Sequence, residues 1–191
     1  RLTRRLAVSD YPYSTQRLQV DESKVHLSPR NLERVRAEQE RIRALWGRQT
    51  RPRFSLPLHP PLEELPSGGR FGARRILNGE PRSPHSGADY PAPRGTPVLA
   101  AAAGTVVLTG DLFFSGRSVF LDHGDGLISM YFHLSEISVD EGDEVKRGQQ
   151  LGEVGSTGRS TGPHLHFGLR WQGARIDPAL LLGGDIPTVD E

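Results

Sequence analysis

The sequence has 191 residues, 35% of them hydrophobic, which is enough for one compact domain with or without an appendage. It contains no cysteine, so disulfides and thiolate metal sites are excluded, and it has no apolar run of the roughly 18 residues that a membrane span needs. The net charge of +1 conceals a segregation, because residues 1–53 carry 13 basic and 6 acidic residues whereas residues 54–191 carry 11 and 17. We therefore expect the two parts to attract each other.

The N-terminal part is predicted to be extended at first and helical afterwards. Residues 17–21 and 25–27 favour two short strands. Ser28 followed by Pro29 is typical of a helix start, with the serine as N-cap and the proline in the first turn. The helix is expected to end near Trp46. Its apolar stripe, which Glu38 and Gln39 interrupt, consists of Leu32, Val35, Ile42 and Leu45.

Proline divides the chain into two predicted parts. Four prolines fall within residues 50–62 and indicate a linker. We expect residues 1–62 to form an N-terminal extended and helical appendage with this linker, and residues 63–191 to form the main domain. Because the strand pattern starts only after the linker, a chain without residues 1–53 is expected to fold. The basic appendage would also be able to dock across a groove in the acidic domain and restrain its activity.

The second part has the pattern of an antiparallel β protein. Short runs rich in β-branched and aromatic residues recur at intervals of about a dozen residues, with turn residues and no helical pattern between them. The predicted fold class is therefore mainly β, an antiparallel sheet or sandwich. The runs are residues 98–101, 104–109, 118–122, 127–134 and 164–170.

Two pairs of polar residues have a spacing that suits a metal site. His85 and Asp89 are four residues apart, so a turn would bring one nitrogen and one oxygen ligand to a single point, and zinc accepts such mixed ligands. His164 and His166 are alternate residues of a predicted strand, where they share one face. Both imidazoles would enter one cavity, while the intervening Leu165 and the following Phe167 pack into the core.

Two further histidines are treated differently. His133 ends the run Met-Tyr-Phe-His, and strand alternation predicts that Tyr131 shares its face and lines a groove, while Phe132 joins the core. An isolated histidine such as His133 is also compatible with a purely structural role. His123 lies in a Gly-Asp-Gly context and is expected to be a surface turn residue.

The combination of these residues indicates a catalytic zinc site. His85, Asp89 and one member of the His164 and His166 pair would make three ligands, with two spare imidazoles for acid–base chemistry. If both members of the pair bound the metal, the four-ligand shell would be closed, as in a structural site. One of the two should therefore bind zinc and the other should stay free.

Three motifs of this sequence resemble, in the same order, those of the lysostaphin/LytM-type zinc metallopeptidases. They are residues 83–89, Ser-Pro-His-Ser-Gly-Ala-Asp, residues 131–134, Tyr-Phe-His-Leu, and residues 162–168, Gly-Pro-His-Leu-His-Phe-Gly. The resemblance extends over about residues 66–182. It implies an antiparallel β domain with a narrow groove and one zinc ion on its floor. It implies the metal ligands His85, Asp89 and His166 and the catalytic histidines His133 and His164.

The same resemblance implies a zinc-dependent metalloendopeptidase that hydrolyses peptide bonds in the stems or cross-links of peptidoglycan. The expected cofactor is one Zn²⁺ per chain, and the expected partners are peptidoglycan peptides rather than nucleic acid. The expected location is the cell envelope, either periplasmic or secreted. The bond that is cut and the oligomeric state stay open.

Two alternatives keep the fold without the hydrolysis. A non-hydrolytic scaffold that binds the cell wall or activates an amidase would show a lost metal ligand, and none is lost here. A carrier domain of the biotinyl or lipoyl type is suggested by residues 139–151, which resemble its hammerhead strands. Lys146 lies in the wrong context for such a modification, and a carrier has no need of His85, Asp89 and His166 together.

Overall fold

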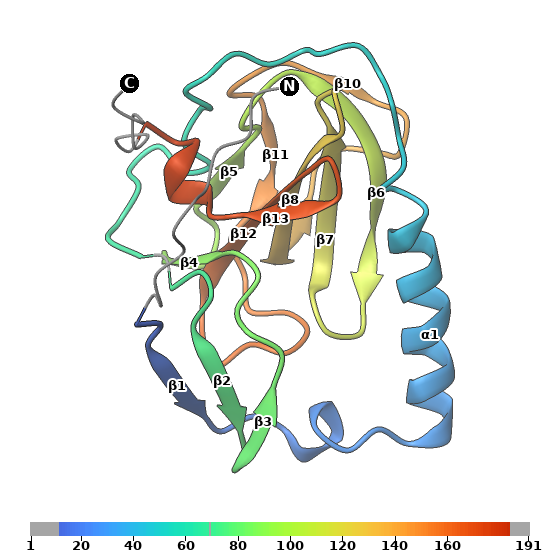
Figure 1. The fold of residues 1–191 in the computed structure, drawn as a ribbon, viewed down its shortest axis with the longest axis vertical. Coiled ribbons are helices and arrows are strands. Elements are labelled where there is room, and N and C mark those ends of the chain that lie inside the picture. The colour runs from blue at the N-terminus through green and yellow to red at the C-terminus, as the bar shows by residue number, and fades with distance from the viewer. Residues whose placement is uncertain (1–11, 69, 184–191) are drawn as a thin grey trace, which may run out of the picture.

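The computed structural model describes residues 12–68 and 70–183, and the strands in this part of the chain form three sheets (Figure 1). The largest sheet has seven strands in the order β10-β6-β7-β8-β12-β13, with β4 also paired to β12, and every pairing in it is antiparallel. Its strands are β4 (Ala88–Pro91), β6 (Gly104–Leu112), β7 (Gly116–Asp122), β8 (Leu127–Leu134), β10 (Glu144–Val145), β12 (His164–Trp171) and β13 (Ala174–Ile176).

Two smaller sheets flank the large one. The first is antiparallel, in the order β5-β11-β9, and consists of β5 (Pro97–Leu99), β9 (Glu136–Ile137) and β11 (Gln150–Glu153). The second has the order β1-β2-β3, and its pair β1–β2 is parallel. It consists of β1 (Thr15–Leu18), β2 (Arg74–Leu77) and β3 (Glu80–Arg82). The predicted fold class, mainly β with antiparallel sheets and one N-terminal helix, is confirmed.

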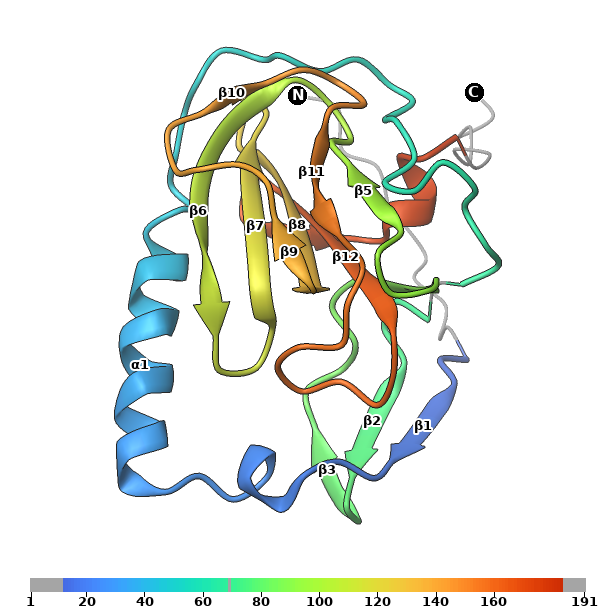
Figure 2. The same ribbon diagram turned by 180° about the vertical axis from the view of Figure 1, so that it is seen from behind.

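The main core lies between the large sheet and the β5-β11-β9 sheet, which is behind the large sheet in Figure 1 and in front of it in Figure 2. Alternate residues of the long strands point into this core, as the pleat of a strand requires. Leu165 and Phe167 of β12 are both fully buried there, as predicted. Each such side chain stabilises the fold by about 1.5–3 kcal/mol relative to an exposed one.

The opposite face of the large sheet is covered in part by helix α1 (Pro29–Arg43), which runs beside β6 in both views (Figures 1 and 2). The hydroxyl of Ser28 caps this helix by accepting the Asn31 N–H at 3.2 Å, as predicted. Leu45, which follows the helix, belongs to a second apolar cluster on this face. Leu32 is 37% exposed and does not join the buried stripe. The sheet residues of the cluster are Leu108, Leu112, Phe120, Ile128 and Met130.

Glu38 interrupts the apolar stripe of α1 because its carboxylate forms a hydrogen bond and an ion pair. One of its carboxylate oxygens accepts the backbone N–H of Phe113, just after β6, at 2.9 Å, and the other pairs with Arg34. Residues 25–27 form no strand. Instead Asp21 caps a 3-10 turn, η1 (Glu22–Lys24), by accepting the Ser23 N–H.

The expected attraction between the two parts of the chain is visible as ion pairs. Arg41 pairs with Glu141 at 3.2 Å, and Arg53 pairs with Glu144. The boundary near residue 62 stays a prediction, but the chain on its N-terminal side is built into the main core. Leu58 and Leu62 are each 1% exposed in that core.

His123 is buried and does not lie at the surface as predicted. Its Nδ1–H donates to the carbonyl of Ala103 at 2.9 Å, so its Nε2 accepts from the Ser129 hydroxyl at 2.7 Å. Burial lowers the pKa of His123 to about 4, which keeps it neutral at pH 7. Residues 50–53 cover this turn, since the Arg53 N–H donates to the His123 carbonyl at 2.7 Å. The local sequence gives no sign of this distant cover.

Within residues 12–68 and 70–183, no helix has the length and apolar character needed to cross a membrane.

Candidate metal centre

Strands β4 and β12 bring three potential metal ligands together. Asp89 of β4 lies opposite His166 of β12 in the antiparallel register. His85 precedes β4, and two backbone hydrogen bonds of 2.9 Å hold it against the turn at Gly72 and Ala73. One ligand atom of each residue then lies within 4.8 Å of the other two.

The three atoms form a triangle with the size of a zinc coordination face. The Asp89 Oδ1 atom is 3.0 Å from His85 Nε2 and 2.7 Å from His166 Nδ1, and the two nitrogens are 3.0 Å apart. Ligand atoms at 2.0–2.2 Å from one tetrahedral zinc ion would lie roughly 3.3 Å from each other. The three atoms would therefore have to move slightly apart to hold the ion. Two imidazoles with one carboxylate are a normal zinc donor set.

The hydrogen bonds of His85 leave the correct nitrogen free. Its Nδ1 lies 3.0 Å from the carbonyl oxygen of Arg70, which can only accept, so Nδ1 carries the proton. The lone pair of Nε2 therefore points into the triangle. A backbone carbonyl that orients a ligating imidazole in this way is the usual outer partner of a metal-binding histidine.

Arg75 holds the second oxygen of the Asp89 carboxylate. The Arg75 Nη2 atom donates to Asp89 Oδ2 at 2.8 Å, which leaves Oδ1 for the two histidines. Burial raises the pKa of Asp89, but the adjoining imidazoles of His166 and His85 outweigh this effect and keep the pKa well below its ordinary value. Asp89 is therefore an ionised carboxylate with one oxygen committed to the triangle.

Two further imidazoles border the triangle. The ring of His164 lies 4.8 Å from that of His133, and His164 Nε2 is 3.7 Å from Asp89 Oδ1. Both rings have their Nδ1–H tied to a backbone carbonyl at 2.8 Å, that of Thr157 for His133 and that of Gly162 for His164. Their Nε2 lone pairs are consequently free to exchange a proton with a ligand in the groove.

Strand β8 breaks the alternation on which one prediction depended. Between the pairs Tyr131–Val119 and Leu134–Arg117, β8 has two residues where β7 has one, which is a β-bulge. His133 is the extra residue and has a φ of 66°. The bulge brings His133 to the same side as Phe132, whose ring stacks on that of His166 at 5.2 Å and 5°.

The prediction that Tyr131 lines the groove is therefore wrong. Tyr131 is fully buried in the main core, where its hydroxyl accepts the Ala101 N–H at 2.8 Å and lies 3.0 Å from the Ser129 hydroxyl. Phe132, predicted to join that core, lies in the groove instead. Phe132 thus has the position on the site face of the sheet that was expected for Tyr131.

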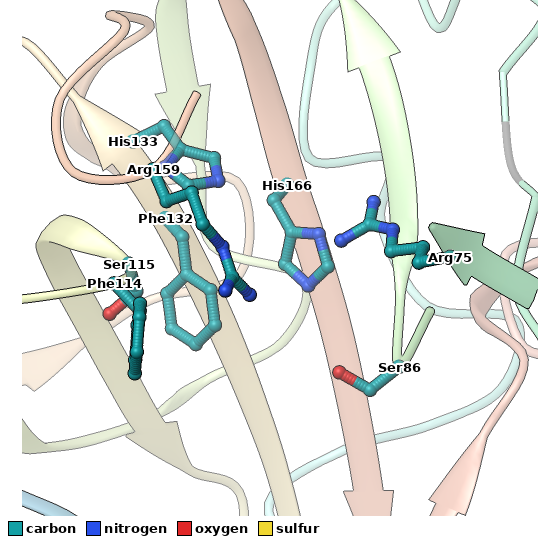
Figure 3. A pocket seen from close by; sticks show the side chains of 8 residues that line it. All are labelled: Arg75, Ser86, Phe114, Ser115, Phe132, His133, Arg159 and His166. Atoms are coloured by element: carbon teal, nitrogen blue, oxygen red, sulfur yellow. The ribbon is translucent and has the colours of Figure 1, made fainter. Parts of the chain in front are cut away.

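A cavity of about 200 Å³ opens beside the triangle (Figure 3). Figure 3 shows the guanidinium groups of Arg75 and Arg159 on opposite sides of the His166 ring. A second, smaller cavity next to His133 and His164 has Leu18 and Val20 of the N-terminal part in its wall. The full lining of the first cavity is Arg75, Ser86, Phe114, Ser115, Phe132, His133, Arg159 and His166.

Comparison with known proteins places this geometry in a family. Residues 83–178, half of the chain, match peptidase family M23. The chain belongs to peptidase family M23. The resemblance to lysostaphin/LytM-type metallopeptidases that the three motifs indicated is thereby confirmed.

Two curated relatives of this M23 chain are named for their activities. It is 43% identical over 95 residues to the peptidoglycan DD-endopeptidase ShyA of Vibrio cholerae, covering 50% of this chain and 22% of that protein. It is 47% identical over 94 residues to the DD-carboxypeptidase/endopeptidase Mpg of Neisseria meningitidis, covering 49% of this chain and 22% of that protein. The matched segment thus spans less than a quarter of each relative's length.

Two solved structures share the fold of the M23 chain. A putative peptidase M23 from Pseudomonas aeruginosa has a TM-score of 0.70 and 43% identity, covering 81% of this chain and 63% of that one. A zinc-containing peptidase from Vibrio cholerae has a TM-score of 0.60 and 30% identity, covering 71% and 41%.

The M23 site also contains residues that the motifs did not indicate. Arg75 reaches the site from β2, a strand that lies outside the motifs. In the sequence, only the positive charge of Arg75 could have indicated that it pairs with an acidic residue. Arg159 stands in the Gly-Arg-Ser-Thr-Gly stretch before His164, but nothing in that stretch predicts which way its side chain points.

Proposed function

We propose that this chain is a zinc-dependent endopeptidase that hydrolyses D,D peptide bonds in the stems or cross-links of peptidoglycan. One zinc ion per chain would be held by His85, Asp89 and His166. The names of the two curated relatives support the substrate class. The proposed place of action is the cell envelope, outside the cytoplasmic membrane, either periplasmic or secreted. The observation that carries the proposal is the triangle of ligand atoms beside two spare imidazoles in an open cavity.

Zinc, when bound to this donor set, supplies a Lewis acid for the scissile carbonyl and lowers the pKa of a bound water to about 7. Two protein side chains would transfer the protons. Burial, followed by repulsion from His166 and His164, lowers the pKa of His133 to about 3, so the ring is neutral at pH 7 and its Nε2 can accept a proton. His164 presents its Nε2 from the opposite strand. Between them the two rings can take up the proton of the attacking water and return it to the leaving amine.

The proposal is tested by digesting isolated peptidoglycan with the purified chain and identifying the released fragments by mass spectrometry. We expect fragments that end at a cleaved D,D bond, and we expect none after chelation or with the Asp89→Ala variant, which lacks the carboxylate ligand. His26→Ala is the matched control, because the His26 side chain pairs with Glu22 and Glu80 and lines neither cavity.

A non-hydrolytic scaffold would bind the same peptidoglycan without releasing any fragment, whether or not zinc is present. Binding without cleavage by the zinc-loaded chain would therefore replace the proposed function with this alternative.

A further inference from the structure

Within the part of the chain that the structure describes, the groove contains one cation whose charge has no partner. Arg75 and Arg159 both line the cavity beside the triangle, but of these two only Arg75 is paired, through its bond to Asp89. Among the described residues, the Arg159 guanidinium has no hydrogen bond or ion pair, and its one contact of note is with the face of Phe114, whose ring centre lies 4.5 Å away. A guanidinium that stacks on an aromatic ring and has no hydrogen-bond acceptor for its N–H groups can bind an anion.

The backbone of Arg159 is anchored beside the cavity. The Arg159 N–H donates to the Phe114 carbonyl at 2.8 Å, which joins the loop before β12 to the β6–β7 turn. Gly158 allows the close approach, since a Cβ atom there would lie 2.3 Å from the Gly116 nitrogen and the residue has a φ of 72°. Arg159 is thus held in place by its neighbours at the wall of the cavity, across from Arg75 (Figure 3).

The electrostatic surroundings of Arg159 favour an incoming anion. Burial lowers the pKa of Arg159, and the positive charges of Arg75 and Arg82 lower it further. Arg159 has no counterion of its own among the described residues, and a carboxylate bound to its guanidinium would offset this repulsion. Arginine binds carboxylates through two parallel hydrogen bonds, which fixes orientation as well as charge.

We propose that Arg159 binds the carboxylate of the substrate residue that supplies the leaving amine. This rests on the proposed function. In a carboxypeptidase substrate, the released residue carries its carboxylate on the same carbon as the amine that is set free. In a cross-link between D-alanine and diaminopimelate, the carbon that bears the released amine also bears a carboxylate. One cation at this position would therefore select both kinds of D,D bond, and it would discriminate against an otherwise identical amide.

The test uses two cross-linked peptide dimers that differ only in the residue supplying the amine, which has a free carboxylate in one and a carboxamide in the other. We expect the zinc-loaded wild-type chain to favour the carboxylate by about tenfold to hundredfold in kcat/KM, the range for a hydrogen-bonded charge. Arg159→Gln should reduce this preference to about one by losing activity on the carboxylate alone. Arg159→Lys should keep part of it, because lysine retains the charge but not the fork.

Arg94→Gln is the matched control, since Arg94 is exposed and lines none of the cavities. Zinc content is measured for every variant. A disturbed metal site would lower the zinc content and would reduce activity on both substrates. An unchanged preference in Arg159→Gln would overturn the assignment of Arg159 while leaving the hydrolase intact. A wild-type chain that cleaves neither dimer nor peptidoglycan would overturn the proposed function and this inference with it.

Discussion

Replacing His166 by alanine is expected to remove zinc and activity together, whereas replacing His164 by alanine should remove activity and leave the zinc in place. His166 supplies a nitrogen 2.7 Å from the Asp89 oxygen, inside the triangle. His164 Nε2 is 3.7 Å from the same oxygen and lies beside the triangle. Loss of an acid–base group lowers the rate by about 10²–10⁴-fold without touching the metal. Elemental analysis of zinc beside turnover measures both effects in each variant.

The two histidines are alternate residues of one strand, so each variant is the natural control for the other. Both substitutions remove an imidazole from the same face of β12 and leave Leu165 and Phe167 in the core. A zinc-free His164→Ala chain together with a zinc-loaded His166→Ala chain would reverse the assignment. Loss of zinc in both would mean that the two rings share the metal.

Deleting residues 1–53 is expected to destabilise the protein, contrary to the expectation from the sequence. The deletion removes Leu45 from the second apolar cluster, together with Ile42 and Trp46, which pack against it. Each large apolar side chain that is buried contributes about 1.5–3 kcal/mol, so the loss is on the order of 4 kcal/mol or more. That is a large share of the roughly 5–15 kcal/mol by which a typical domain is stable.

The deletion also removes the partners of a buried carboxylate. The side chain of Asp122 is 3% exposed and accepts bonds of 3.1 Å from Arg48 and from the Thr50 hydroxyl. Guanidinium unfolding and size-exclusion chromatography of the truncated chain measure the total effect. Leu45→Ala in the full chain should reproduce part of it, and Leu32→Ala, at an exposed position of α1, should not. The predicted division would be restored if the truncated chain were monomeric and its free energy of unfolding lay within about 1 kcal/mol of that of the full chain, because this is less than the burial of one such side chain contributes.

The strand pattern of the sequence predicted the site where the strands are regular. In β12 the alternation of His164, Leu165, His166 and Phe167 is the alternation that the structure has. It failed in β8, because a bulge inserts His133 as an extra residue, and two residues in a row then point to the groove. A bulge depends on the register with the neighbouring strand, and no single-strand pattern contains that information.

The N-terminal part illustrates the same limit at longer range. Ser28 and Pro29 predicted the helix start because capping is local. The burial of His123 and of Leu58 depends on segments that are distant in the sequence and adjacent only in the fold. Arg159 combines both cases. Its loop lies directly before the third motif, whereas the lack of a charge partner for Arg159 among the described residues is apparent only when the surrounding side chains are in place.

The most direct test of the account is a titration of the metal-free chain with zinc while hydrolysis of a D,D cross-linked peptide dimer is followed. The triangle of His85, Asp89 and His166 predicts that activity rises in proportion to added zinc and stops rising at one zinc per chain. Asp89→Ala should stay inactive over the same range. A metal-free preparation with full activity, or activity that needs a second equivalent of zinc, would contradict the single three-ligand site.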